Sequence, residues 1–111
     1  MSPTRRGEVW WVEFGPSTGG EIQRTRPAVV VSNNTSNAVL NRVVVVPLSR
    51  RVAKVYPGEA RVNAGGTQAK AMADQIATIS VRRLRARLGA ISDTDLRAVE
   101  DAILRHLAIR R

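Results

Sequence analysis

Short apolar runs separated by polar turns rich in glycine and proline fill the chain up to about residue 91. Runs of this length, rich in β-branched and aromatic residues, are typical of strands. We predict strands at residues 8–14, 27–32 and 42–48, a short strand within 58–66, and one strand or a kinked pair within 69–80. Residues 15–24 hold three glycines and a proline and are predicted to be a loop. The polar residues that follow Ser32 predict a turn or a short helical cap.

The hydrophobic pattern changes its period after residue 91 and predicts a C-terminal helix over residues 93–111. Apolar residues recur there at helical spacing, at Leu96, Val99, Ile103 and Leu107. Ser92 is a suitable N-cap, and Asp95 follows three residues later in the positively polarised first turn. Arg110 and Arg111 would complement the negative end of the helix.

The two prolines in the strand regions have positional meaning. Pro27 opens its strand, where the missing N–H removes no ladder hydrogen bond. Pro47 lies inside an apolar run and predicts a bulge or an edge near the end of that strand.

About five antiparallel strands with short turns, followed by one helix, predict a mainly β fold. The expected architecture is a small twisted barrel that the C-terminal helix closes or plugs, in a single domain over residues 1–111. The order is not an alternation of strands and helices, which disfavours a nucleotide-binding parallel sheet.

Composition excludes several classes of protein. Cysteine is absent, which excludes disulfides, thiolate metal sites and cysteine nucleophiles. The N-terminal residues have no apolar run of the signal-peptide kind, and no apolar stretch is long enough to span a bilayer. We therefore expect a cytoplasmic protein.

The charge is strongly positive and unevenly distributed. Lysine and arginine number 18 against nine acidic residues, and 16 of the 18 are arginine. Between Ile22 and Ile91 twelve basic residues face only Glu59 and Asp74. Such a basic domain favours a polyanionic partner, because arginine binds phosphate bidentately and stacks on bases. The alternative from composition alone is a protein whose charge serves solubility.

The sequence lacks the residues that most nucleases use for catalysis. His106 is the single histidine, which excludes a pair of catalytic histidines. The acidic residues are few and scattered, and no metal-ligand spacing is present, so we expect no metal and no other cofactor. The glycines near residue 19 are not followed by the Gly-Lys-Ser/Thr of a phosphate-binding loop.

An arginine and a hydroxyl residue remain as candidate chemistry. RNA can be cut by its own 2′-OH when a protein orients the attack and stabilises charge on the phosphorane. Arg26 opens the second predicted strand, and Ser49 follows the third. If the two strands pair, both side chains reach one cleft. The alternative is that Arg26 is a solvated charge.

Trp10 and Trp11 are neighbours in the first predicted strand and must point to opposite faces. One faces the core. The outward one either stacks on a base or packs in a dimer interface.

Four blocks of the sequence resemble the MazF/PemK (Kid) toxin family in order and spacing. They are "RRGEVWWVEF", "GGEIQRTRPAVVVSN", "VVVVPLS" and "ADQIATIS", and together they cover about residues 5–88. The resemblance implies an SH3-like barrel, a symmetric homodimer and metal-independent cleavage of single-stranded RNA, which leaves a 2′,3′-cyclic phosphate and a 5′-hydroxyl. It also implies an antitoxin of the MazE type, whose acidic disordered tail covers the RNA groove.

The resemblance also assigns residues. The family's catalytic arginine falls on Arg26, its catalytic hydroxyl on Ser49, and a loop glutamate that orients the arginine on Glu21. Contacts to bases fall on Asn33 and Gln75.

This chain departs from the family's pattern at two positions. Serine replaces the usual threonine at residue 49, and Ala77 stands where the family usually has a basic residue. Arg50 and Arg51 are placed to compensate for the second departure, and together with Arg24 they are further candidate RNA contacts.

Two alternatives remain at this point. One is a toxin of the CcdB type, which shares the fold and poisons DNA gyrase by binding. The other is an RNA-binding barrel without catalysis. Neither alternative requires Arg26 or Ser49.

Overall fold

The computed structural model describes residues 4–15 and 24–110. Its strands are β1 (Glu8–Glu13), β2 (Thr25–Val30), β3 (Arg42–Ser49), β4 (Glu59–Ala64), β5 (Thr67–Met72), β6 (Ala77–Ser80) and β7 (Leu84–Ala90). Its helices are α1 (Asn34–Val39) and α2 (Asp93–His106), with short 3₁₀ turns η1 (Ala73–Gln75) and η2 (Val81–Arg83).

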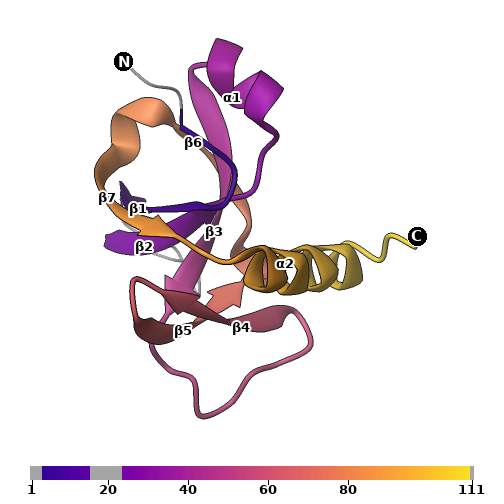
Figure 1. Ribbon diagram of the computed structural model, residues 1–111. Helices are drawn as coiled ribbons and strands as arrows, with labels where there is room; N and C mark the ends of the chain where they lie inside the picture. The colour runs from indigo at the N-terminus through magenta and orange to yellow at the C-terminus, as the bar shows by residue number, and fades with distance from the viewer. Residues whose placement is uncertain (1–3, 16–23, 111) are drawn as a thin grey trace.

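The strands form one strongly curled sheet in which neighbours run antiparallel (Figure 1). The order is β4-β5-β3-β2-β1-β7, and β6 pairs with the first half of β3. The predicted mainly β fold with a C-terminal helix is confirmed, and the curl makes it a half-barrel.

Pro47 marks the place where β3 changes partners. Pro47 lies opposite Ala28 of β2, whereas the next residue, Leu48, lies opposite Ala71 of β5. A proline has no N–H to give to a ladder, which suits it to such a transition. The irregularity predicted near the end of this strand is therefore the corner at which β3 passes from one half of the sheet to the other.

Valine dominates a core that lies on both faces of β2 and β3. Val29 and Val46 belong to one buried cluster, while Ala28, Val30 and Val45 belong to a second one. Because successive side chains of a strand point to opposite faces, strands buried on both sides appear as continuous apolar runs. This accounts for "PAVVV" and "VVVVPL" in the sequence.

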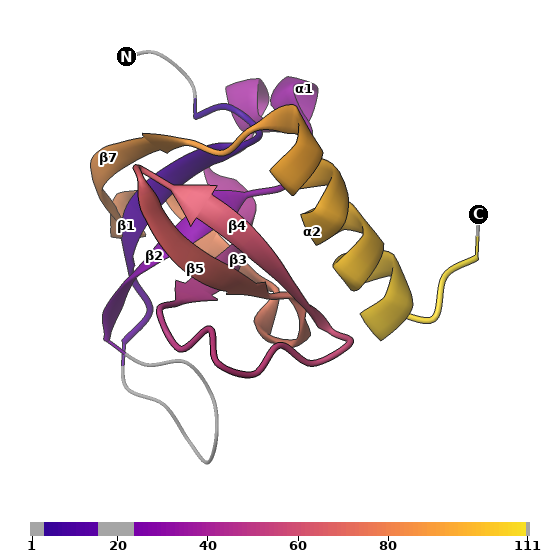
Figure 2. The same cartoon turned by 60° about the horizontal axis from the view of Figure 1, so that its bottom comes forward.

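Helix α2 packs along β4 and covers the first core cluster (Figure 2). The predicted cap is confirmed: the Ser92 Oγ accepts a hydrogen bond from the Asp95 N–H at 3.0 Å. The predicted end was wrong, because the helix stops at His106 and Leu107 is its C-cap. Ala108 then takes a left-handed backbone conformation (φ 57°), which ends an α-helix.

Seven strands in the described residues replace the predicted five or so. The added edge strand, β7, pairs with β1 with two shifts of register. Most of its side chains are exposed, so the sequence "LRARLGA" shows no alternation of apolar and polar residues. Charged residues on an edge strand oppose pairing with other chains, which explains why this run resembles a solvated face.

Candidate active site

A pocket of about 450 Å³ opens between the ends of β2 and β3 and the turn that joins β4 to β5. Its lining residues are Trp11, Arg26, Pro27, Leu48, Ser49, Arg50, Arg51, Ala64, Gly65, Thr67, Ala69 and Leu88. The pocket therefore joins an apolar floor to three arginines and two hydroxyl groups.

Arg26 and Ser49 both line this pocket, and they come from neighbouring strands of the sheet. The β2–β3 ladder ends at the pair Ala28 and Pro47, and Arg26 and Ser49 each lie two residues beyond that pair. Beyond it β3 turns to β5, where Ser49 lies opposite Lys70. Arg26 is partly exposed, and its guanidinium makes no hydrogen bond or ion pair with another described residue. Within the described residues, no acceptor competes with an anion in the pocket for this cation.

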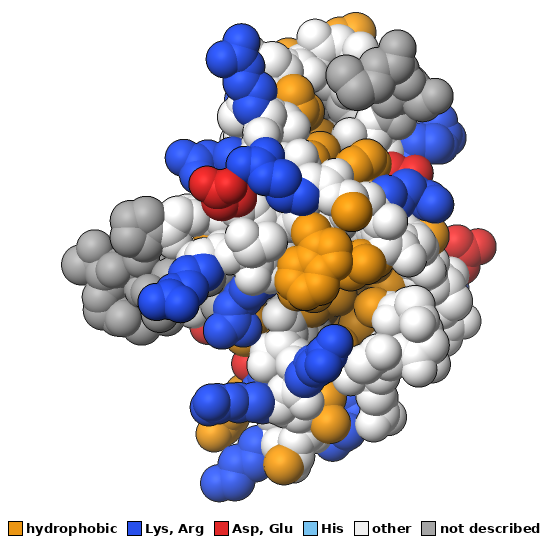
Figure 3. All heavy atoms as spheres, turned by 90° about the vertical axis from the view of Figure 1, so that its left-hand side faces the viewer, with side chains coloured by type: hydrophobic (Ala, Val, Ile, Leu, Met, Phe, Trp, Pro, Cys, Tyr) orange, Lys and Arg blue, Asp and Glu red, His pale blue; other side chains and the backbone are white. Residues whose placement is uncertain are grey.

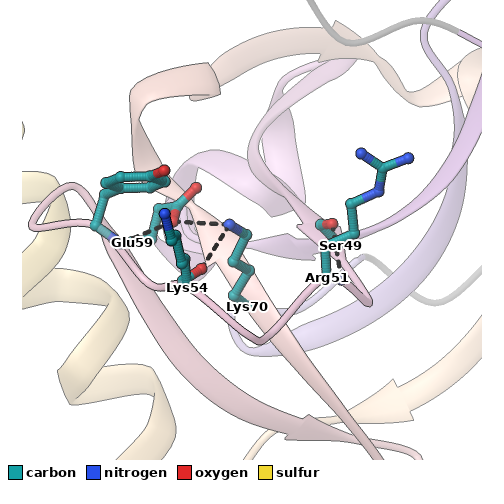
Figure 4. A network of polar contacts seen from close by, with 6 residues as sticks. Ser49, Arg51, Lys54, Glu59 and Lys70 are labelled. Carbon is teal, nitrogen blue, oxygen red and sulfur yellow. Dashed lines mark hydrogen bonds and ion pairs between the residues drawn. The ribbon is translucent and has the colours of Figure 1, made fainter.

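The Ser49 hydroxyl is oriented by the backbone that follows it. Its Oγ accepts a hydrogen bond from the Arg51 N–H at 3.1 Å (Figure 4). A hydroxyl has one hydrogen to donate besides its lone pairs. With a lone pair occupied by Arg51, the hydroxyl can donate that hydrogen to a phosphate oxygen.

The two neighbouring tryptophans of β1 point to opposite faces of the strand, as predicted. Trp10 packs against the second core cluster, and its indole N–H donates to the Glu8 Oε1 at 3.1 Å. Trp11 lines the pocket together with Pro27 and Leu88, of which Leu88 is 42% exposed. An aromatic ring beside arginines offers a stacking surface for a base.

Positive charge surrounds apolar side chains on the face of the molecule shown in Figure 3. Arg50 and Arg51 are exposed at the rim of the pocket, and no carboxylate belongs to its lining among the residues that the structure describes. Elsewhere, arginines of β7 are neutralised by β1, with Arg85 paired to Glu13 and Arg87 to Glu8. The field at the pocket is consequently positive.

Glu8 is held as a carboxylate outside this pocket. Its partial burial acts to raise its pKa, but three donors outweigh that effect and lower the pKa below its ordinary value. The donors are the Arg5 backbone N–H, the Trp10 indole and the Arg87 guanidinium.

The remaining predicted site residues lie apart from the pocket or outside the described residues. Asn33 is the N-cap of α1, where its Oδ1 accepts from the Ser36 N–H, and it lines a second groove between α1 and α2. Gln75 ends η1 and is partly buried. Arg24 is exposed, its N–H donates to the Gly15 carbonyl, and it is absent from the pocket lining. Glu21 falls outside the described residues.

Sequence reasoning missed two features of the site. The first is the apolar floor that Leu88 and the β4–β5 turn contribute, since both come from segments without a motif. The second is a buried ion pair between Lys70 and Glu59 beside Ser49. Lys70 alternates with alanines in "QAKAM", a pattern typical of a lysine on the solvent face of a strand, so the sequence carried no signal of this ion pair.

Metal ligands do not gather within residues 4–15 and 24–110, where no group of three His, Cys, Asp or Glu side chains is arranged to hold an ion. Neither described α-helix combines the length and the apolar character needed to cross a membrane.

The chain is similar in sequence to a known family and to a characterised protein. Residues 5–107 match the family described as PemK-like, MazF-like toxin of type II toxin-antitoxin system. Endoribonuclease MazF9 of Mycobacterium tuberculosis is 39% identical, over 93% of this chain and 95% of that protein.

Solved structures agree. MazF of Deinococcus radiodurans superposes with a TM-score of 0.86 at 27% identity, covering 98% of this chain and 100% of that one. A MazE–MazF structure from the same organism gives a TM-score of 0.78, also at 27% identity, with 99% and 100% covered. Because the family match extends over nearly the whole of this chain, the chain belongs to the PemK-like, MazF-like toxins of type II toxin–antitoxin systems.

Proposed function

We propose that this toxin is an endoribonuclease that cuts single-stranded RNA through attack of the RNA's own 2′-OH on the adjacent phosphorus. The observation that carries the proposal is the convergence of Arg26 and Ser49, from the neighbouring strands β2 and β3, on a pocket with a positive rim and an apolar floor. The 39% identical relative, Endoribonuclease MazF9, supports the same activity.

Each part of the pocket has a role in this reaction. Arg26 supplies a permanent cation to the phosphorane oxygens, and the Ser49 hydroxyl supplies a second donor. Arg50 and Arg51 bind neighbouring phosphates, while Trp11 receives a base. The attacking hydroxyl comes from the substrate, so the protein's contribution is to hold the sugar and phosphate in line. These groups act without a metal ion, and we propose that none is required.

The test of this function is incubation of the purified protein with a long single-stranded RNA in EDTA, followed by mapping of the cut sites. We expect cleavage at short motifs, and we expect no cleavage where the 2′-OH at a mapped site is replaced by hydrogen. Activity that is lost in EDTA and restored by magnesium would contradict the proposal. Intact RNA that nevertheless binds would favour an RNA-binding barrel, and inhibition of DNA gyrase would favour a toxin of the CcdB type.

An antitoxin of the MazE type is the proposed protein partner, and its acidic segment competes with RNA for the pocket. The arginine-rich rim and the apolar floor suit an acidic segment that carries apolar anchors. The MazE–MazF structure from Deinococcus radiodurans supports such a partner. Both ligands neutralise the same arginines, so binding should weaken as salt rises.

The measurement is a competition between the antitoxin and an uncleavable 2′-deoxy substrate, each titrated at several salt concentrations. We expect mutually exclusive binding. A ternary complex in which both ligands keep full affinity would refute the competition.

We further propose a cytoplasmic homodimer, as the family resemblance implies. Val39 and Leu40 at the end of α1, and Leu107 and Ile109 after α2, are large exposed apolar residues that a second copy would cover. Sedimentation equilibrium tests this proposal, and a monomer at micromolar concentration would contradict it.

A further inference from the structure

Lys70 of β5 is a buried cation beside the pocket. Lys70 is 8% exposed, and it lies directly opposite Ser49 in the β3–β5 ladder. Removing an ammonium from water is unfavourable unless its hydrogens find partners. The Lys70 Nζ donates to the Glu59 Oε1 at 3.0 Å and to the Lys54 backbone carbonyl at 2.9 Å. It also lies 5.5 Å from the centroid of the Tyr56 ring.

These partners all belong to, or adjoin, residues 50–58, the segment that joins β3 to β4 without a helix or strand of its own. The Tyr56 N–H donates to the Glu59 Oε1 at 2.9 Å, and the Glu59 N–H returns a hydrogen bond to the Tyr56 carbonyl. Lys70 therefore fixes the middle of the 50–58 segment at Lys54 and, through Glu59, its far end (Figure 4).

The near end of the same segment forms the pocket. Arg51 orients the Ser49 hydroxyl through its N–H, and Arg50 and Arg51 line the rim. A segment of this length without regular secondary structure has many conformations, and most of them do not present Arg51 to Ser49. The contacts of Lys70 select one conformation.

Stability alone does not account for the ion pair. Both side chains are about 10% exposed, and replacing a buried pair with uncharged residues is often neutral or stabilising. The ion pair also holds the 50–58 segment beside the pocket, and an apolar pair would make no hydrogen bond to that segment.

We propose that Lys70 is a positioning residue for RNA cleavage: by tethering the 50–58 segment to β5, it holds Arg51 against Ser49 and keeps Arg50 and Arg51 at the pocket. The inference rests on the proposed ribonuclease function. It requires that loss of the tether slow the cleavage step more than it weakens RNA binding, because the arginines themselves remain.

The test is the double variant Lys70→Met/Glu59→Gln, which removes both charges together and so leaves no unpaired buried ion. We expect a thermal midpoint within about 5 °C of the wild type. At saturating protein, the single-turnover rate of RNA cleavage should fall by about tenfold. The dissociation constant for a 2′-deoxy RNA should change by less than about threefold, since Arg50 and Arg51 stay on the segment and a mobile arginine can still bind phosphate.

Lys54→Met is the matched control. Lys54 is exposed and gives only its backbone carbonyl to the tether, so this variant removes one lysine charge nearby and keeps the contact. We expect a wild-type cleavage rate. If Lys54→Met slows cleavage as much as the double variant does, the effect does not depend on the tether and the proposal fails.

A second readout needs no substrate. The ¹⁵N order parameters of the 50–58 segment should fall from about 0.85 to below about 0.6 in the double variant and stay unchanged in Lys54→Met. Unchanged order parameters, or increased mobility with a wild-type cleavage rate, would overturn the proposal. If the wild-type protein cuts no RNA, the proposed function fails, while the order parameters still decide whether Lys70 tethers the segment.

Discussion

Arg26→Ala is expected to lower the single-turnover rate of RNA cleavage by about a hundredfold or more. Arg26 supplies the fixed positive charge at the pocket that it shares with Ser49, on a strand whose position is set by its ladders with β1 and β3. A preorganised cation of this kind stabilises charge that develops only in the transition state, so its loss acts on the rate more than on substrate binding.

The variant should remain folded. Arg26 is partly exposed, and its side chain makes no hydrogen bond or ion pair with another described residue, so little native structure depends on that side chain. Arg26→Lys should recover little activity, because an ammonium cannot reproduce the planar fork of a guanidinium. Circular dichroism and thermal melting beside the kinetics separate loss of chemistry from loss of fold.

Arg97→Ala is a suitable control, because Arg97 is an exposed arginine of α2 outside the pocket. It changes the net charge by the same amount and should leave the rate within about twofold. A folded Arg26→Ala protein that cuts at the wild-type rate would show that the catalytic assignment is wrong.

Ser49→Ala is expected to slow the same step by roughly tenfold to a hundredfold. The substitution removes the hydroxyl donor and also leaves the Arg51 N–H without its acceptor. Ser49→Thr should keep activity close to the wild type, because it retains the hydroxyl, and the added methyl restricts its rotamer. Single-turnover rates and RNA affinities of both variants test this prediction.

Equal loss of activity in the two Ser49 variants would mean that packing at this position matters and not the hydroxyl. A full rate in Ser49→Ala would remove Ser49 from the mechanism. In either case Thr67, the other hydroxyl residue of the pocket, becomes the next candidate.

The strands that could be predicted are those buried on both faces or bounded by strong turn signals. β2 and β3 consist largely of valine because the core covers both sides, and β3 ends at Ser49, which shares the pocket with Arg26. β7 was missed because an exposed edge strand needs no apolar alternation, and its arginines resemble a solvated face.

The candidate site was predictable only as far as strand order determined it. Arg26 and Ser49 follow from two adjacent strands, whereas Trp11 and Leu88 reach the pocket from β1 and β7, whose relative positions depend on how the sheet curls. The role of Lys70 depends on its contacts with the Lys54 carbonyl and the Glu59 carboxylate, and a linear pattern does not encode such contacts. The base-contact roles predicted for Asn33 and Gln75 stay predictions, since both residues lie away from this pocket.

The chemistry of the cut ends tests the central claim most directly. The wild-type protein would be incubated with a defined single-stranded RNA in EDTA, and the fragments analysed by mass spectrometry. Attack by the 2′-OH, assisted by Arg26 and Ser49, predicts a 2′,3′-cyclic phosphate on the upstream fragment and a 5′-hydroxyl on the downstream one. A 3′-hydroxyl paired with a 5′-phosphate would mean that water is the attacking group, and it would contradict this mechanism.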